Sequence, residues 1–258
     1  MMKLNNVIVF AASLLLLSGC KNNAAQQAEI VQKDTTFDRL LWLQYHCPDD
    51  EDEYVYKWNW AYEVRDSLGI EDLDSLAQLS YQFESDYEAR FGGVTSDMVI
   101  GADAYAGAAR FRMLNVYQAL AELMYDTPLG AEANCYFEDF VLWEKVFVEY
   151  ANNCDNEGSI RFIELPMYYK ELADMRTEVL EEELKCLSNS GVDSISKAIK
   201  KEPKWNGADR AIRKWYDYRM SMADKLQKVD SRKGQCLREY TLKQIRSFKS
   251  NSYNNANT

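Results

Sequence analysis

Apolar residues recur along most of this chain at the spacing of amphipathic helices. The pattern is clear between residues 71 and 91, where steps of three or four separate Leu73, Leu76, Leu79, Phe83 and Tyr87. No segment keeps the alternation of apolar and polar residues that is typical of a half-buried strand. The pattern therefore predicts an all-α fold, an antiparallel helical bundle of about seven to nine helices with short connections.

Gly, Pro and polar clusters divide this pattern into separate helices. Gly69 is expected to cap the second helix, and residues 159–165 are expected to be a short extended piece. Five consecutive acids at residues 49–53 are interpreted as a solvated helix start, because they lack the alternate spacing of a calcium loop. The expected helices cover residues 37–46, 53–68, 71–91, 95–125, 131–152, 166–187, 192–201, 208–229 and 235–248.

The first twenty residues have the parts of a secretory signal: Lys3, an apolar run from Val7 to Leu17, and the small residues Ser18 and Gly19. Leu17-Ser18-Gly19-Cys20 resembles a bacterial lipobox, which implies a lipoprotein whose Cys20 carries acyl chains such as palmitate. An ordinary cleaved signal is the alternative. A transmembrane anchor is not expected, because a span needs about 20 apolar residues. Lys21 rather than Asp follows Cys20, which slightly favours the outer over the inner membrane.

These features predict the domain organisation. Residues 1–19 are the lipoprotein signal peptide, and residues 20–35 are the lipid anchor with a flexible tether. Residues 36–248 form a single helical domain, and residues 249–258 form a disordered polar tail. Membrane contact is expected through the N-terminal lipid, which places the protein in the bacterial cell envelope.

Charge is unevenly distributed within the predicted domain. The 258-residue chain carries a net charge of −11, but residues 21–196 hold 13 Lys and Arg against 35 Asp and Glu. Residues 197–249 hold 16 against 6. The basic part (197–248) is expected to dock on the acidic part (36–196). The alternatives are an acidic face for a cationic protein and a basic face for anionic lipid or glycan. Nucleic acid is not expected as a partner.

Five cysteines remain after Cys20: Cys47, Cys135, Cys154, Cys186 and Cys236. Five is an odd number, so at most two disulfides can form, and their pairing stays open. Cys135 and Cys154 flank one predicted helix, which would hold them about 25 Å apart at 1.5 Å per residue. Any disulfide is therefore expected to join different helices.

The sequence offers no recognisable catalytic set, metal site or cofactor motif, so we expect a protein that is not an enzyme. The only histidine, His46, is interpreted as a helix-end residue. A carboxylate-based hydrolase is the alternative, because acids are abundant, and a purely structural envelope protein is another. Tryptophans could line a binding groove, but most are expected in the core. Because Trp58 and Trp60 are two positions apart, one of them is expected at an exposed or rim position.

The stretch from Ala208 to Arg219 resembles the closing helix of the LprI-type lysozyme-inhibitor domain, whose pattern is W-x-x-Y-R followed by an acid and a Cys. Trp215, Tyr218 and Arg219 match it, whereas Ala223 stands where the family has its Cys. The resemblance implies a small exported helical protein that binds a cationic lysozyme, with these three residues as candidate binding residues. A packing role for Trp215 and Tyr218 needs no partner.

Overall fold

The computed structural model describes residues 51–90, 95–125, 127, 129–130, 134–152, 161–188, 203, 205 and 209–255. The chain divides into two units, residues 1–38 and 39–258, and all described residues belong to the second. The predicted signal peptide, Cys20, the tether, His46, Cys47, Cys154 and the expected helices at 37–46 and 192–201 lie outside the described residues.

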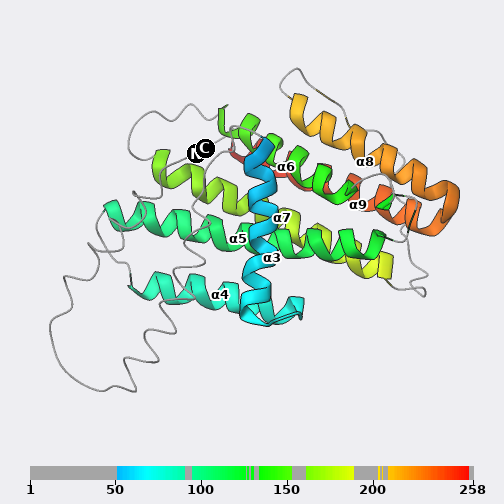
Figure 1. Ribbon diagram of the computed structural model, residues 1–258. Helices are drawn as coiled ribbons and strands as arrows, with labels where there is room; N and C mark the ends of the chain where they lie inside the picture. The colour runs from blue at the N-terminus through cyan, green and yellow to red at the C-terminus, as the bar shows by residue number, and fades with distance from the viewer. Residues whose placement is uncertain are drawn as a thin grey trace, which may run out of the picture. The chain divides into compact units, whose positions relative to one another are not determined.

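The described residues form seven helices and no strand, which confirms the all-α helical bundle (Figure 1). None of these helices is both long enough and apolar enough to pass through a membrane. Their bounds are α3 (Glu51–Leu68), α4 (Leu73–Arg90), α5 (Thr95–Met124), α6 (Cys135–Asn152), α7 (Arg161–Ser188), α8 (Arg210–Val229) and α9 (Ser231–Asn255).

The bundle is built around α5, α6 and α7, which run alternately up and down. Tyr136 at the start of α6 bonds to Glu183 near the end of α7, and Glu144 further along α6 bonds to Tyr169 near the start of α7. Helix α8 packs on α6, α9 packs on α7 and α8, and α4 packs on α5. The first half of α5 buries Ala102, Ala104, Ala106, Ala108 and Ala109, whose small side chains let neighbouring helices approach closely.

Helix α3 lies across the other helices rather than along them (Figure 1). Its two tryptophans are both buried, Trp58 at 5 % and Trp60 at 6 % exposure, so the expectation that one would be exposed or at a rim is wrong. The ring of Trp58 packs on Phe137 of α6, and the ring of Trp60 packs on Phe111 of α5. A crossing helix can bury side chains on both flanks, because each flank meets a different part of the core.

The starts of α6 and α7 differ from the expected ones by several residues. Helix α7 begins at Arg161, so residues 161–165 are helical rather than extended. Ile163, Pro166 and Tyr169 have helical spacing, and α7 continues through Pro166, which removes one backbone hydrogen bond from the helix. Helix α6 begins only at Cys135, because Asn134 has a φ of 34°, which is not helical.

Helix α9 is longer than expected at both ends, running from Ser231 to Asn255 instead of 235–248. Asp230 ends α8 and also caps α9, since its carboxylate accepts a bond of 2.9 Å from the backbone N–H of Lys233. At the other end, residues 249–255 continue the helix instead of forming a disordered tail. Extending an existing helix gains one hydrogen bond per residue, whereas starting one is costly.

Candidate partner-binding face

The outer face of α3 combines an apolar centre with acidic ends. Its exposed residues fall at helical spacing, so they share one side of the helix. Tyr56 is 57 % exposed and Val55 is 45 % exposed. An apolar centre with a polar rim is typical of a protein-binding surface. The face consists of Asp52, Val55, Tyr56, Asn59, Glu63 and Asp66.

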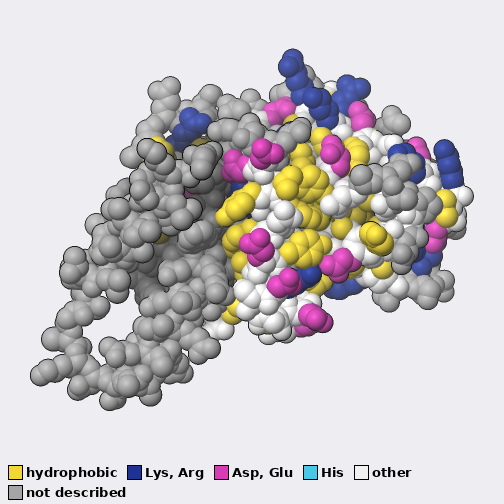
Figure 2. All heavy atoms as spheres, in the orientation of Figure 1, with side chains coloured by type: hydrophobic (Ala, Val, Ile, Leu, Met, Phe, Trp, Pro, Cys, Tyr) yellow, Lys and Arg dark blue, Asp and Glu magenta, His cyan; other side chains and the backbone are white. Residues whose placement is uncertain are grey.

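Further acids extend this face where α3 turns into α4. Arg65 on the flank of α3 is bound by Glu122 of α5 at 3.3 Å and lies over the ring of Tyr62. Asp72 caps α4 by accepting bonds from the backbone N–H and the hydroxyl of Ser75. Figure 2 shows acidic side chains at the end of α3 that meets α4. We call this group the acidic corner: Glu63, Asp66, Glu71, Asp72, Asp74 and Glu122, all exposed.

The basic helices dock on only part of the acidic segment. Helix α8 packs on α6 and α9 packs on α7, whereas α3 and α4 pack on α5. Glu149 of α6 accepts bonds from the backbone N–H groups of Arg210 and Ala211, where it meets the positive end of α8. Lys243 of α9 pairs with Glu182 of α7 at 2.5 Å. The expected docking therefore holds for α6 and α7, while the acidic corner stays exposed.

The three residues of the W-x-x-Y-R pattern lie on the inner side of α8. Trp215 and Arg219 have no exposed surface, and Tyr218 is half-buried. The Trp215 indole N–H donates to Asp139, and Arg219 binds Asp139 at 2.8 Å and also pairs with Glu183. Their position favours the packing interpretation, because neither Trp215 nor Arg219 offers surface to a partner.

The buried charges around this pattern form a balanced cluster. Arg176 binds the same Asp139 carboxylate at 2.9 Å. Its Nε also donates a hydrogen bond of 2.8 Å to the hydroxyl oxygen of Tyr117. Two arginines thus face two carboxylates, Asp139 and Glu183, and all four side chains are fully buried. The Tyr218 hydroxyl donates to the carbonyl of Cys135 at 2.9 Å. The cluster joins the basic segment to the acidic one, and its carboxylates are closed to any substrate.

A second buried cluster lies further along α6. Glu144 forms an ion pair with the guanidinium of Arg110 at 3.2 Å and accepts a hydrogen bond from the hydroxyl of Tyr169. Lys57 of α3 lies close by, 5 % exposed and 2.9 Å from Glu53. Burial, and next the positive charge of Arg110, lower the pKa of Lys57 to about 8.

The carboxylate-hydrolase alternative requires two acids that converge in an accessible cleft. One group has a suitable acidity: burial alone raises the pKa of Asp103 on α5 to about 6. Only burial shifts that pKa, whereas a second carboxylate close by would raise it further. Glu144, Asp139 and Glu183 are buried and bound by arginines. The described residues therefore do not assemble the predicted carboxylate pair around any of these four acids.

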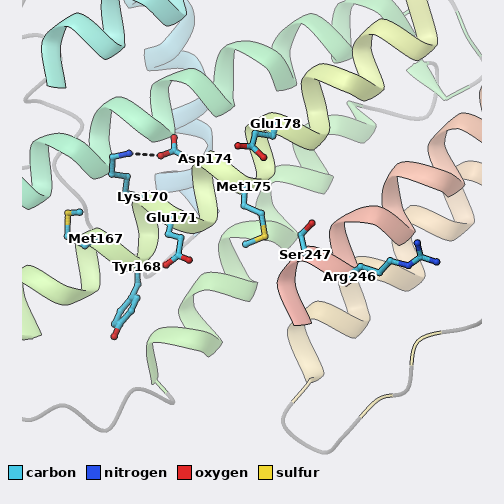
Figure 3. A pocket seen from close by; sticks show the side chains of 9 residues that line it. All are labelled: Met167, Tyr168, Lys170, Glu171, Asp174, Met175, Glu178, Arg246 and Ser247. Carbon is cyan, nitrogen blue, oxygen red and sulfur yellow. Dashed lines mark hydrogen bonds and ion pairs between the residues drawn. The ribbon is translucent and has the colours of Figure 1, made fainter. Parts of the chain in front are cut away.

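An open groove of about 860 Å³ runs between α7 and α9 (Figure 3). Asp174 on its wall is held by Lys170 at 2.5 Å and by Arg112 at 2.7 Å. Among the described residues that line it, Tyr168 is the only aromatic one, so they do not form the aromatic-lined cleft that a carboxylate-based hydrolase would need. Its lining consists of Met167, Tyr168, Lys170, Glu171, Asp174, Met175, Glu178, Arg246 and Ser247.

The described tryptophans do not gather in one groove. Trp58, Trp60, Trp143 and Trp215 are buried in the core, which confirms the packing interpretation for these four. Trp205 is half-buried and packs on the ring of Tyr216. Trp42 lies outside the described residues.

The cysteines follow the expected geometry where the structure describes them. Cys186 of α7 and Cys236 of α9 form a disulfide with a Cα–Cα distance of 6.4 Å, so the bridge joins different helices as predicted. Cys135 is a buried free thiol, and burial raises its pKa to about 11. In the described part of the chain, no cluster of three or more His, Cys, Asp or Glu side chains could hold a metal ion.

Comparison with known proteins finds no matching protein-family model, no matching curated protein and no matching solved structure. The resemblance to the LprI-type domain therefore stays an expectation carried by Trp215, Tyr218 and Arg219. The sequence did not single out the outer face of α3, although the exposed apolar pair at Val55 and Tyr56 lies between acids at helical spacing.

Proposed function

We propose that this protein is a non-enzymatic, lipid-anchored protein of the cell envelope that binds a cationic protein through the outer face of α3 and the acidic corner. The observation that carries the proposal is that this acidic surface stays exposed although the same chain supplies a basic segment. An acidic surface attracts cationic partners over a distance and speeds their association. The N-terminal signal and the lipobox resemblance support the lipid anchor.

A lysozyme-like hydrolase is the proposed partner. Such enzymes are cationic, and the resemblance to the LprI-type domain points in the same direction. Tyr56 provides a large exposed ring at the centre of the face, and tyrosine is enriched among residues that dominate binding energy. The buried cluster around Asp139 has a separate, structural role, because its charged residues lie on α6, α7 and α8 rather than on the helix that carries the face.

Binding of the full chain to a cationic lysozyme tests the proposal. We expect association at about 20 mM salt that weakens steeply by 300 mM, since surface charges are screened over about 8–10 Å at physiological ionic strength. The triple variant Glu63→Gln, Asp66→Asn, Glu71→Gln should lower the affinity about tenfold at low salt, mainly through slower association. The variant Tyr56→Ala should weaken binding at both salt concentrations, because it removes apolar contact.

A matched control removes the same charge elsewhere. Glu138, Glu178 and Asp217 are also exposed but lie on α6, α7 and α8. The triple variant Glu138→Gln, Glu178→Gln, Asp217→Asn should bind lysozyme like the wild type. Equal weakening by both triple variants would mean that net charge, not this face, attracts the partner. Absence of binding at low salt would refute the lysozyme proposal and favour a purely structural protein.

A further inference from the structure

Apart from the buried Arg219, helix α8 carries its positive charges on the side away from the bundle. Its buried side packs Ile212, Trp215 and Met222 toward α6 and α9. The opposite side is exposed and holds five cations against two acids, Asp217 and Asp224. All seven charged residues fall within about a third of the helix circumference at 100° per residue. We call the cations the basic stripe: Arg210, Arg213, Lys214, Lys225 and Lys228.

The cations on this side outnumber the acids. Asp224 pairs with Arg238, which reaches across from α9, so its charge is already balanced. Asp217 lies 4.0 Å from Arg213, with both side chains more than 60 % exposed. Exposed pairs of this kind bind weakly and exchange readily with other charges. In Figure 2, lysine and arginine side chains gather along the edge that α8 forms in Figure 1.

We propose that the basic stripe binds the anionic phospholipid headgroups of a membrane surface. The cations lie at both ends of a helix about 30 Å long and share one side of it, so they can touch a flat charged surface together. Val229 follows Lys228 at the end of the helix, is 64 % exposed, and adds an apolar side chain beside the basic stripe. Lysine and arginine near an anionic leaflet are attracted to it, and a lipid chain with a basic patch anchors more stably than one chain alone.

The acidic corner does not oppose this contact. Helix α8 packs on α6 and α9, whereas the corner lies on α3, α4 and α5, so at least one helix separates the corner from the stripe. Each helix is about 10 Å thick, whereas surface charges are screened within about 8 Å at physiological ionic strength. The bound orientation would turn the basic stripe toward the lipid and leave the outer face of α3 open to a protein partner.

Sedimentation of the full chain with vesicles tests this inference. One set of vesicles contains equal phosphatidylglycerol and phosphatidylcholine, and the other contains phosphatidylcholine alone. The apolar N-terminal run can insert into both sets, so the measured quantity is the ratio of the two binding constants. We expect a ratio above ten at 100 mM salt. The variant Arg213→Gln, Lys214→Gln, Lys228→Gln should reduce the ratio at least tenfold.

The control removes three exposed cations from other helices, with Lys145→Gln, Arg161→Gln and Lys185→Gln. It should keep the wild-type ratio. A ratio near one for the wild type, or an equal loss in both variants, would overturn the inference. Binding that depends on the stripe but occurs only with a soluble anionic polysaccharide would also overturn it. That the stripe meets a membrane in the cell rests on the proposed envelope location. Lysozyme binding is a separate measurement, and the stripe variant should leave it unchanged.

Discussion

Arg219 has a role that its sequence context only partly indicates. The pattern around it suggested a binding residue, whereas the structure places its guanidinium fully inside the bundle between Asp139 and Glu183. A single helix pattern shows which residues face inward, but it cannot show that the inward side of α8 meets carboxylates on α6 and α7. Those partners are 80 and 36 positions away in the sequence. The chemistry of the cluster therefore becomes visible only in the folded chain.

The first prediction concerns this buried arginine. Replacing Arg219 by Ala leaves Asp139 and Glu183 buried with one cation, Arg176, near Asp139. Removing one partner from a buried ion pair costs about 3–5 kcal/mol of unfolding free energy. Urea denaturation measures this loss of unfolding free energy, and Arg213→Ala is the control. Arg213 pairs with Asp217 on the exposed side of the same helix, so its loss should cost less than about 1 kcal/mol. Similar effects of the two substitutions would contradict the burial argument.

The second prediction uses the lowered pKa of Lys57. Its pKa is about 8 in the folded chain and about 10.4 in an unfolded one. Folding therefore opposes its protonation: the penalty is full below pH 8 and disappears as the pH rises toward 10.4. Lys57→Met should be more stable relative to the wild type at pH 7 than at pH 10, by about 2–3 kcal/mol. Denaturation at both pH values measures this difference, and the substitution Lys228→Met, at an exposed lysine, serves as the control. An equal effect of Lys57→Met at both pH values would contradict the shift.

At the scale of elements, helical periodicity predicted the fold class and most helices, because each helix buries one stripe against a neighbour. The capping role of Gly69 was also predictable, and its φ is 63°. The missed features depend on contacts distant in the sequence. Gly234 lies inside α9 beside the backbone of Gln227 in α8, where a Cβ would come within 2.5 Å. The expected start at residue 235 left this glycine outside the helix, since nothing local in the sequence shows the close approach.

The disulfide between Cys186 and Cys236 gives a third prediction, at the scale of α7 and α9. The bridge closes a loop of 50 residues, which restricts the unfolded chain. Removing a native disulfide of this kind costs about 2–4 kcal/mol. The double variant Cys186→Ala, Cys236→Ala should lose that much stability to denaturant. Dithiothreitol should lower the unfolding free energy of the wild type to that of the variant, and it should leave the unfolding free energy of the variant unchanged. Destabilisation of both proteins by the reductant would assign the effect to another disulfide.

At the scale of the whole molecule, charge is separated into an acidic corner and a basic stripe, with balanced ion pairs buried between them. The uneven charge was evident in the sequence, and so was the possibility that the basic part docks on the acidic part. The sequence could not show which acids stay exposed, because that depends on which helices pack against one another. Docking uses α6 and α7, and it leaves the acids at the end of α3 without basic neighbours from α8 or α9.

This arrangement predicts that the acidic corner, which we propose as part of a binding surface, lowers the stability of the fold. Glu63 and Asp66 lie in the last two turns of α3, where carboxylates repel the negative end of the helix. The double variant Glu63→Gln, Asp66→Asn should therefore raise the Tm by about 1–3 °C at low salt. The gain should shrink in 0.5 M salt, which screens exposed charges. Calorimetry measures the Tm, and the same variant should bind lysozyme more weakly. A lower Tm would mean that these acids stabilise the fold, and it would remove the reason to regard their exposure as serving a partner.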